Sequence, residues 1–530
     1  MPKAEKGTPV YLFLCFLLYL RFALPLIPVA ADDIRMVNVF SIDEADIAAE
    51  VLRLYHAGFL EAPSFKYGGV FYYVPLLILK LWGVFGAVTD RLVILTLRTF
   101  CMVAGAGCLW LTYRIGCLVF DRVSGLMGVF LLLVSPTFLR WSVESHPDLP
   151  QLFWLLWSLL CCCGLCRAFS AKDVVLASAF AGLAFGTKYS GVFLLPVIAL
   201  ALLLPDEKGA MSFRVGVERL RQGRYWVWLA MVAVVFVVVF GMSNPYVLMR
   251  FDAFRESLLA EKAIMDFGHT FRADTRGVLW LEMLWGLMGY AHAAVFAVYS
   301  GAWMREGFSS VWICRVVVPV LVVVFSWGSL SGSVDLFGGK FGRVEGKVEL
   351  VVGRWLGEAF PEETTLLFDA YAYIPEKFRN VYRSFGISYP MVTHFEPDLL
   401  VIRQAIANDF KNREDAARSR REEKDFLDRH FFYKYIQEGL IPDYKLVRDF
   451  GSVSVYRRSA PKVRKGASAT ELWRRLRKHY SDGKAYGVSE ARRTMGDIHA
   501  SLGLEDLAQQ EYERARERYV VSVEHLDTLR

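Results

Sequence analysis

The chain has 530 residues, of which 55% are hydrophobic, and a net charge of +7. An ordinary soluble domain is about 45–50% apolar by a similar count, so this composition argues against a wholly soluble protein. Its arginine-rich blocks lie between apolar stretches, as the positive-inside rule predicts, which argues against a nucleic-acid-binding surface. The apolar excess ends near residue 330, and the mixed-charge remainder is long enough to bury its own core.

The first predicted element is a membrane span at residues 11–31. Lys3 and Lys6 precede it, and its apolar run is long for a signal peptide, whose hydrophobic region has roughly 7–15 residues. We therefore expect an uncleaved anchor with its N-terminus in the cytoplasm. Arg21 lies near the middle of this span and is expected to face protein or water, because a charge in hydrocarbon is costly.

Eight further stretches are apolar enough for spans, which need about 20 residues each. They lie at about 98–117, 123–140, 150–168, 174–188, 189–204, 225–243, 278–299 and 311–330. Positive charge collects in the loops between alternate spans, so nine spans with a cytoplasmic N-terminus place the C-terminal region outside. Residues 70–88 are also apolar, but they contain Lys80, and counting them would reverse this charge pattern. We therefore expect an interfacial or re-entrant helix there, on the outer face.

The region after the last span predicts a small α/β domain. A helix ending near Pro361 is followed by a strand at 365–368, a second strand at 399–402 and a hairpin at 444–456. Asp369, at the end of the first strand, could face a site, but a turn-forming aspartate is the favoured interpretation.

The last part of the chain resembles a single tetratricopeptide helix pair. One repeat cannot build a solenoid, so we expect a helical appendage that packs on the α/β domain or binds a protein partner. The predicted architecture is therefore a polytopic α-helical membrane protein of about nine spans with two further parts. The three predicted domains are a transmembrane domain at 1–335, an outer-face α/β domain at 336–460 and the helical appendage at 461–530.

The first predicted outer loop carries a group of carboxylates that includes Asp43 and Glu44. Adjacent carboxylates can serve as a general base and its electrostatic partner, or can bind a metal. Ser41 followed by Glu44 also forms a capping box at the start of a helix. The two interpretations are compatible.

Further along this loop, Lys66 stands beside two glycines and close to Tyr72, at the entrance of the predicted interfacial helix. A lysine in this position could hold a phosphate at the level of the lipid headgroups. The alternative is an aromatic belt with a snorkelling lysine, which needs no ligand.

Two more segments place ionisable groups at predicted outer turns. His146 and Asp148 lie in a short loop between two spans, where charge close to hydrocarbon indicates function, although the polar groups could also cap the two helix ends. Lys188 interrupts a long apolar run, where it suits a lipid phosphate or a structural snorkelling role.

The remaining signals are weaker. Asn244-Pro245 predicts a turn that leads into an outer loop with His269, and a lone histidine is more often structural. The cysteine cluster at 161–166 lacks the second pair of a zinc site and is better explained by membrane-embedded or lipidated thiols. No nucleotide-binding glycine loop is present.

Taken together, this order of segments resembles the C-fold membrane glycosyltransferases, in particular the protein O-mannosyltransferases and the bacterial lipid A aminoarabinose transferases. The resemblance covers roughly residues 10–275. The matching positions are Asp43, Glu44, Lys66, Arg98, Asp148 and the AGLAFGTKYSG stretch at 181–191. Members of that family usually have more spans before the soluble domain than the nine expected here. In those proteins the late spans form one wall of the substrate pocket, so this wall is expected to differ in the present chain.

The resemblance implies transfer of a sugar from a polyprenyl-phosphate donor to an acceptor hydroxyl, with inversion, on the periplasmic or luminal face. It implies that Asp43 is the general base and that Glu44 or Asp148 orients groups or stabilises developing charge. The substrate-binding residues that we expect are Lys66, Arg98, His146, Lys188, Tyr72 and His269. No cofactor is required, although the carboxylates leave room for a divalent metal.

The expected location is a bacterial inner membrane, with the C-terminal domain in the periplasm. The expected partners are the membrane, the donor lipid, an acceptor that can be a protein, a lipid or a glycan, and no nucleic acid. Two other functions remain open. A lipid or anion transporter would place its ionisable groups near mid-membrane, and a non-catalytic scaffold would tolerate changes at Asp43 and Lys66.

Overall fold

The computed structural model divides into two compact units, which are described separately. The helical unit comprises Met1–Asp32, Glu50–Leu259 and Thr275–Gly342, and the sheet unit comprises Asp33–Ala49, Ala260–Asp274 and Arg343–Arg530. The structure describes residues 8–57, 63–203, 213–267, 347–388, 395–411 and 443–459, together with single residues and short runs elsewhere up to position 509. The spans expected at 278–299 and 311–330, and nearly all of the appendage, lie outside the described residues.

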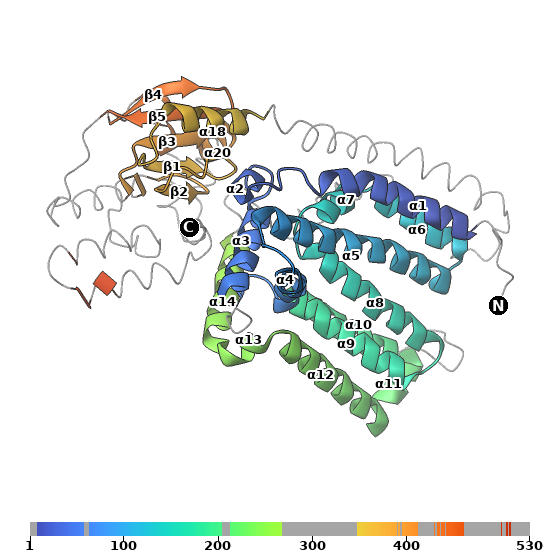
Figure 1. Ribbon diagram of the computed structural model, residues 1–530. Coiled ribbons are helices and arrows are strands. Elements are labelled where there is room, and N and C mark those ends of the chain that lie inside the picture. Colours follow the sequence, from blue (N-terminus) through green and yellow to red (C-terminus); the bar gives the residue numbers. More distant parts are fainter. Residues whose placement is uncertain are drawn as a thin grey trace. The chain divides into compact units, whose positions relative to one another are not determined.

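The helical unit is a bundle in which the long helices pack side by side. Helix α5 packs against α6 and α8, α8 against α9, and α9 against α12 (Figure 1). Its elements are α1 (Thr8–Ala23), η1 (Leu24–Leu26), α4 (Gly69–Trp82), α5 (Asp90–Val119), α6 (Arg122–Leu133), α7 (Pro136–Val143), α8 (Asp148–Arg167), α9 (Ala171–Thr187), η2 (Tyr189–Phe193), α10 (Leu194–Leu203), α11 (Phe213–Leu220), α12 (Gly223–Ser243) and α13 (Pro245–Met249). Helices α3 (Ile42–Ala57) and α14 (Phe251–Phe267) each cross the boundary between the units.

Three described helices are long and apolar enough to cross a membrane, namely α5, α8 and α12. The pair α6 and α7 would make a fourth span, but it bends by 67°. The bend falls where Ser135 accepts a hydrogen bond from Phe138 N and caps a new helix that begins at Pro136. The stretch predicted as one span at 123–140 is therefore broken, and the total of about nine spans stays a prediction.

Helix α4 occupies the stretch expected to be interfacial or re-entrant. It has 14 residues, which at about 1.5 Å per residue cannot cross a hydrocarbon core of about 30 Å. Pro75 lies inside it, and Lys80 at its C-terminal end donates to the carbonyl oxygen of Tyr55. This length agrees with the sequence-based expectation.

The sheet unit contains a five-stranded mixed sheet with the strand order β2-β1-β3-β5-β4. Strand β1 pairs in parallel with β2 and β3, whereas β5 pairs antiparallel with β3 and β4. The strands are β1 (Leu366–Asp369), β2 (Val381–Ser384), β3 (Leu399–Arg403), β4 (Tyr444–Asp449) and β5 (Val453–Arg458). The helices are α2 (Ile34–Val37), the first part of α3, α18 (Val348–Ala359) and α20 (Gln404–Lys411).

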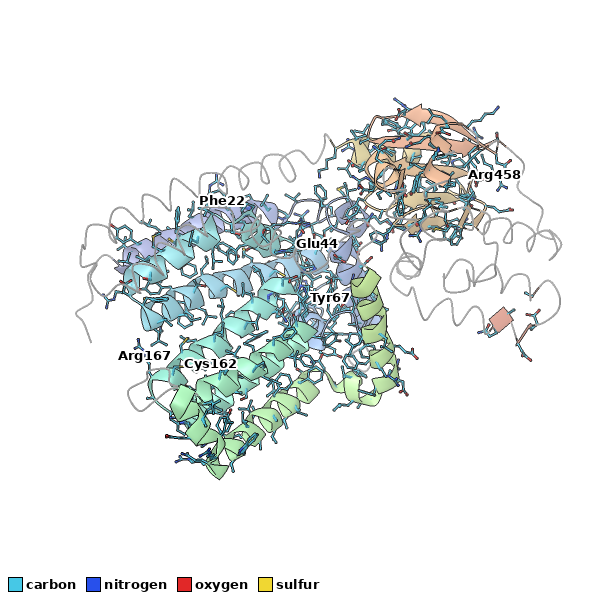
Figure 2. All side chains as sticks on the ribbon, turned by 180° about the vertical axis from the view of Figure 1, so that it is seen from behind. Phe22, Glu44, Tyr67, Cys162, Arg167 and Arg458 are labelled. Atoms are coloured by element: carbon cyan, nitrogen blue, oxygen red, sulfur yellow. The ribbon has the colours of Figure 1, made fainter. Side chains whose placement is uncertain are left out.

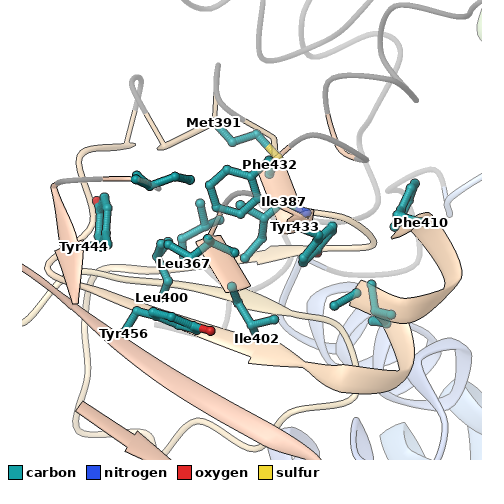
Figure 3. Close-up of a cluster of buried hydrophobic side chains, with 14 of the residues drawn as sticks. Leu367, Ile387, Met391, Leu400, Ile402, Phe410, Phe432, Tyr433, Tyr444 and Tyr456 are labelled. Carbon is teal, nitrogen blue, oxygen red and sulfur yellow. Dashed lines mark hydrogen bonds between the residues drawn. The ribbon is translucent and has the colours of Figure 1, made fainter. Parts of the chain in front are cut away.

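Helices cover both faces of this sheet, because alternate side chains of the central strands point to opposite sides. Leu366 and Phe368 join a buried cluster with α18. Leu367, on the other face, joins a cluster with α20 and with Phe432, Tyr433 and Ile436 (Figure 3). The α/β character, the helix near 355 and both strands of the hairpin are confirmed, whereas β2 was not predicted.

Candidate active site

An ion-paired cluster lies where α8 begins and α9 ends. Asp148 is the first residue of α8, and its Oδ1 accepts a hydrogen bond from Lys188 Nζ at 2.9 Å. Its Oδ2 pairs with Nδ1 of His146. The side chains of Asp148 and Lys188 are 35% and 34% exposed, so both remain accessible to a ligand. The structure thus brings together three predicted site residues.

Aromatic rings fix the orientation of His146 within this cluster. The ring of Trp141 lies against it, with centroids 4.2 Å apart, and the ring of Tyr67 meets it edge-on. The Tyr67 hydroxyl lies 3.4 Å from His146 Nε2. When Nδ1 carries the proton toward Asp148, Nε2 is the acceptor for this hydroxyl. The His146 ring is therefore held in one orientation between Asp148 and the Tyr67 hydroxyl.

The turn that carries Lys188 is held by Gln151, one helical turn into α8. Gln151 Nε2 donates to the Lys188 carbonyl oxygen at 2.7 Å and to Ser190 Oγ at 2.9 Å. Sequence reasoning missed Gln151, although a buried amide in the first turn of an otherwise apolar helix is a usable signal.

The Lys66 segment joins the same place. Gly68 N donates to the carbonyl oxygen of Thr187 at 3.0 Å, and the Tyr189 hydroxyl donates to the carbonyl oxygen of Phe65 at 3.0 Å. Lys66 Nζ lies 5.4 Å from the centre of the Tyr67 ring. The segment that carries Lys66 therefore lies against the turn that carries Lys188, within the helical unit.

The junction between α12 and α13 closes one side of this region. Asn244 Oδ1 accepts a hydrogen bond from Gly69 N, the first residue of α4, so Asn244 joins helices far apart in the chain. A small pocket opens beside this contact. It is lined by Pro63, Phe65, Tyr67, Gly69, Tyr73, Tyr189, Asn244, Tyr246 and Val247. The buried Tyr73 hydroxyl has no hydrogen-bond partner among the residues that the structure describes.

The polar cluster and the basic loop ends lie at opposite ends of the helical unit. Tyr67 is near one end and Arg167 near the other (Figure 2). The same separation follows from the helices, because Asp148 begins α8 and Arg167 ends it, about 30 Å away for a 20-residue helix.

Two expected ligand-binding residues are deeply buried. Arg98, on α5, donates from Nη1 to the carbonyl oxygens of Ile27 at 2.8 Å and Val29 at 2.6 Å. It thereby holds the chain that follows η1. Tyr72, on α4, is 2% exposed and packs edge-on against Phe71. His269 lies outside the described residues.

The predicted carboxylates Asp43 and Glu44 belong to the sheet unit. They occupy the first turn of α3, where Ser41 Oγ accepts a hydrogen bond from Glu44 N at 3.3 Å. This bond confirms the predicted N-cap. Glu44 is fully buried and Asp43 half-buried. Among the described residues, no group of three acidic, histidine or cysteine side chains is arranged to hold a metal ion.

The comparisons with known proteins bear on the same residues. Residues 73–242 match the family described as dolichyl-phosphate-mannose-protein mannosyltransferase. This stretch includes His146, Asp148 and Lys188, and the match confirms the resemblance to membrane glycosyltransferases. Together with the apolar helices, it indicates a membrane glycosyltransferase. A comparison with curated protein sequences gives no match.

Solved structures show a distant likeness. ArnT from Cupriavidus metallidurans is 13% identical over 83% of this chain and 97% of the other, with a TM-score of 0.40 in the apo state and 0.41 bound to undecaprenyl phosphate. The Archaeoglobus fulgidus oligosaccharyltransferase in complex with Zn and sulfate is 10% identical over 96% of this chain and 86% of the other, with a TM-score of 0.38. These likenesses are too distant to transfer a ligand, a metal or a residue role.

Proposed function

We propose that this protein moves a sugar from a polyprenyl-phosphate donor to an acceptor hydroxyl on the periplasmic or luminal face of the membrane, with inversion at the anomeric carbon. The observation that carries the proposal is the Lys188–Asp148–His146 cluster at the helix ends. It lies within the stretch that matches a family whose described donor is mannose on a lipid phosphate.

The leaving group in this reaction is a lipid phosphate, so cations are its natural partners. Lys188 and Lys66 would neutralise the charge that grows on the phosphate as the sugar departs. Asp148 already accepts a hydrogen bond from Lys188 and would hold the Lys188 ammonium group in place until the donor binds. Because a lipid phosphate leaves readily once neutralised, no nucleotide and no metal is required, although a divalent ion can assist.

The sugar ring would lie over the mouth of the small aromatic-lined pocket beside Tyr73, with one of its hydroxyl groups entering the pocket. The buried Tyr73 hydroxyl is suited to a sugar hydroxyl, and aromatic faces suit the apolar side of a sugar ring. His146, Tyr72 and His269 complete the substrate-binding residues of the proposal. The hydrogen bonds of Arg98 to backbone carbonyl groups favour a structural role, in which Arg98 fixes the conformation of the chain before the first outer loop.

The acceptor hydroxyl needs a base, and we assign this role to Asp43. The acceptor oxygen forms a bond to the anomeric carbon, the bond from that carbon to the phosphate oxygen breaks, and the acceptor proton goes to the Asp43 carboxylate. Glu44, buried in the same helical turn, would orient the acceptor or stabilise positive charge on the sugar, a role it shares with Asp148.

The proposal includes a bacterial inner-membrane location with the α/β domain (336–460) outside, and a protein partner for the helical appendage (461–530). A transporter of lipids or anions is the second candidate. It is favoured by two helix breaks, the 67° bend between α6 and α7 and the turn at Lys188, because interrupted helices are common in transporters.

A transfer assay separates these candidates. Purified protein is incubated in detergent with radiolabelled polyprenyl-phosphate sugars and a membrane acceptor extract. The wild type is compared with Asp43→Asn and with Asp252→Asn, an exposed aspartate on α14. We expect transfer by the wild type and by Asp252→Asn, and a loss of roughly 10²–10⁴-fold with Asp43→Asn. Absence of transfer with every donor would contradict the proposal, and equal transfer by all three would contradict the assignment of the base.

A further inference from the structure

The segment that carries Asp43 and Glu44 is fastened to the sheet by a set of buried polar contacts. We refer to the contacts of residues 33–46 with residues 372–383 as the loop clamp. All its members belong to the sheet unit. Its centre is Arg383, on β2, which is 2% exposed. Arg383 Nη2 donates to Asp46 Oδ1 at 2.6 Å, and Arg383 Nη1 donates to Asn38 Oδ1 at 2.9 Å.

Further bonds fasten the same segment to the turn after β1. Asn38 Nδ2 donates to the Ala372 carbonyl oxygen at 3.2 Å, and Arg35 Nη1 donates to the Pro375 carbonyl oxygen at 3.1 Å. That turn includes Tyr371, a non-glycine residue in the left-handed region with φ of +67°. Such a conformation costs free energy and persists where the surrounding contacts require it. The carbonyl groups of this turn accept the two hydrogen bonds from the segment.

Tyr373 adds a contact at the beginning of the segment. Its hydroxyl donates to Asp33 Oδ2 at 3.1 Å, and burial raises the pKa of Tyr373 to about 12, so the hydroxyl keeps its proton. Asp33 also caps α2, because its side chain accepts a hydrogen bond from Arg35 N. The clamp thus extends from the start of α2 to the second turn of α3.

Asp46 depends on Arg383 for its charge balance. Its side chain is 10% exposed, and among the described residues Oδ1 accepts from Arg383 whereas Oδ2 has no hydrogen-bond partner. A buried carboxylate that loses its cation is strongly destabilised. A small cavity lies beside the pair, lined by Asn38, Ala45, Phe368 and neighbouring residues. Without Arg383, Asp46 would therefore have room to turn away.

We propose that Arg383 is a positioning residue for the carboxylates of the first outer loop, an inference that rests on the proposed function. Asp43 and Asp46 are three residues apart on α3, and each residue turns an α-helix by about 100°, so fixing Asp46 fixes the rotation of the helix. The direction of Asp43 follows from that rotation. Sheet and carboxylates then act as one rigid body, and Arg383 influences the reaction without touching a substrate.

Three variants of the full-length protein test this inference. Arg383→Met removes the cation, and Arg383→Lys keeps the charge but cannot donate to Asp46 and Asn38 in the same fork geometry. Arg379→Met is the matched control, because Arg379 lies just before β2 and forms an exposed pair with Glu362, with its own side chain 70% exposed. Each variant is assayed as the monodisperse fraction, so that loss of folded protein is not counted as loss of activity.

The split between kcat and the donor KM is the first readout. We expect kcat to fall about 10²-fold in Arg383→Met, since a misplacement of about 1 Å can cost that much, with the donor KM nearly unchanged. Arg383→Lys is expected to be intermediate and Arg379→Met unchanged. If Arg383→Met lowers only the yield of folded protein and keeps its kcat, Arg383 is merely structural and the inference is overturned.

Hydrogen exchange of residues 33–49, followed by mass spectrometry, is the second readout and does not depend on activity. We expect exchange in this peptide to be about tenfold faster in Arg383→Met than in the wild type or in Arg379→Met. If the wild type transfers no sugar, the proposed function fails, while faster exchange still supports the clamp. Unchanged exchange would overturn the clamp even if the transferase activity is present.

Discussion

At the scale of single residues, Asp148 is the centre of the ion-paired cluster, because its two carboxylate oxygens pair with His146 and Lys188. Asp148, His146 and Lys188 were recognised because charges between apolar stretches are costly unless they serve a purpose. The sequence could not show that Asp148 binds both of the others, since that pairing depends on where α8 begins relative to the end of α9. Gln151 was missed because its partners, Lys188 and Ser190, are almost forty residues away in the chain.

Asp369 shows a second limit at this scale. It begins a turn, as expected, because its carbonyl oxygen accepts a hydrogen bond from Ala372 N at 3.3 Å. Its side chain, however, is fully buried and accepts hydrogen bonds from the Tyr433 hydroxyl and from Arg403 N. Burial raises the pKa of Asp369 to about 7, although these bonds favour its charged form. The burial arises from packing of α20 and of Phe432, Tyr433 and Ile436, which the local sequence does not reveal.

This burial predicts a pH dependence for the sheet unit. The folded pKa of about 7 lies above the unfolded value, so the folded state holds an extra proton between about pH 4 and pH 7. Its stabilising contribution is complete below that range and is lost as the pH rises through 7. We expect the exchange protection of β1 and β3, corrected for intrinsic rates, to be lower at pH 8 than at pH 5.

Asp369→Asn should flatten this dependence, because the amide does not titrate. Glu363→Gln, which changes an exposed carboxylate close to β1, is the control and should keep the wild-type slope. The same slope in Asp369→Asn and in the wild type would show that Asp369 titrates normally.

At the scale of elements, helix positions were predictable where apolar runs are long, and less so where helices break. The spans expected at 98–117, 150–168 and 225–243 correspond to α5, α8 and α12. The break between α6 and α7 was missed, although the Ser-Pro pair at 135–136 is a recognisable helix start. The approach of α4 to the end of α9 joins residues more than a hundred positions apart, which no local pattern encodes.

The close packing of α4 against the end of α9 leads to a prediction about Gly68. A Cβ atom added to Gly68 would lie 2.0 Å from the carbonyl oxygen of Gly186, which is backbone and cannot turn aside. Gly68→Ala should therefore separate α4 from α9 and cost about 1–3 kcal/mol, as overpacking does. A drop in the thermal unfolding midpoint of the detergent-purified protein measures this. Gly223→Ala is the control, since nothing lies within 4 Å of the added atom, and it should leave the midpoint unchanged or slightly raised. Equal midpoints for both variants would contradict the close packing.

At the scale of the whole molecule, composition alone indicated a membrane part and a soluble part, and the family match over 73–242 agrees with the first. The structure adds that residues 33–49, which the sequence assigned to the membrane domain, cluster with the sheet instead of with the helices. Charge and hydropathy cannot reveal this, because the segment is held by individual hydrogen bonds such as those of Arg383.

The orientation in the membrane is a prediction at this scale. Arg167 at one end of the helical unit and the polar cluster at the other favour a cytoplasmic Arg167 loop and an external polar cluster. Nine expected spans with a cytoplasmic N-terminus would put the sheet unit outside as well. Alkaline phosphatase fused after residue 168 should be inactive in a bacterial host, whereas a fusion after residue 459 should be active. Green fluorescent protein at the same two positions should give the reverse result. The opposite pattern would place the sheet unit in the cytoplasm.

The proposed function requires above all that the cluster around Lys188 and Asp148 binds a lipid phosphate. The most direct measurement is the affinity of the purified protein for polyprenyl phosphate, compared among the wild type, Lys188→Gln and Lys172→Gln. Lys172 is exposed in the first turn of α9, at the end of the helix opposite to Lys188. We predict that Lys188→Gln weakens binding at least about tenfold, as expected for loss of a charged hydrogen bond, and that Lys172→Gln leaves it unchanged. Equal affinity of Lys188→Gln and the wild type would contradict the site.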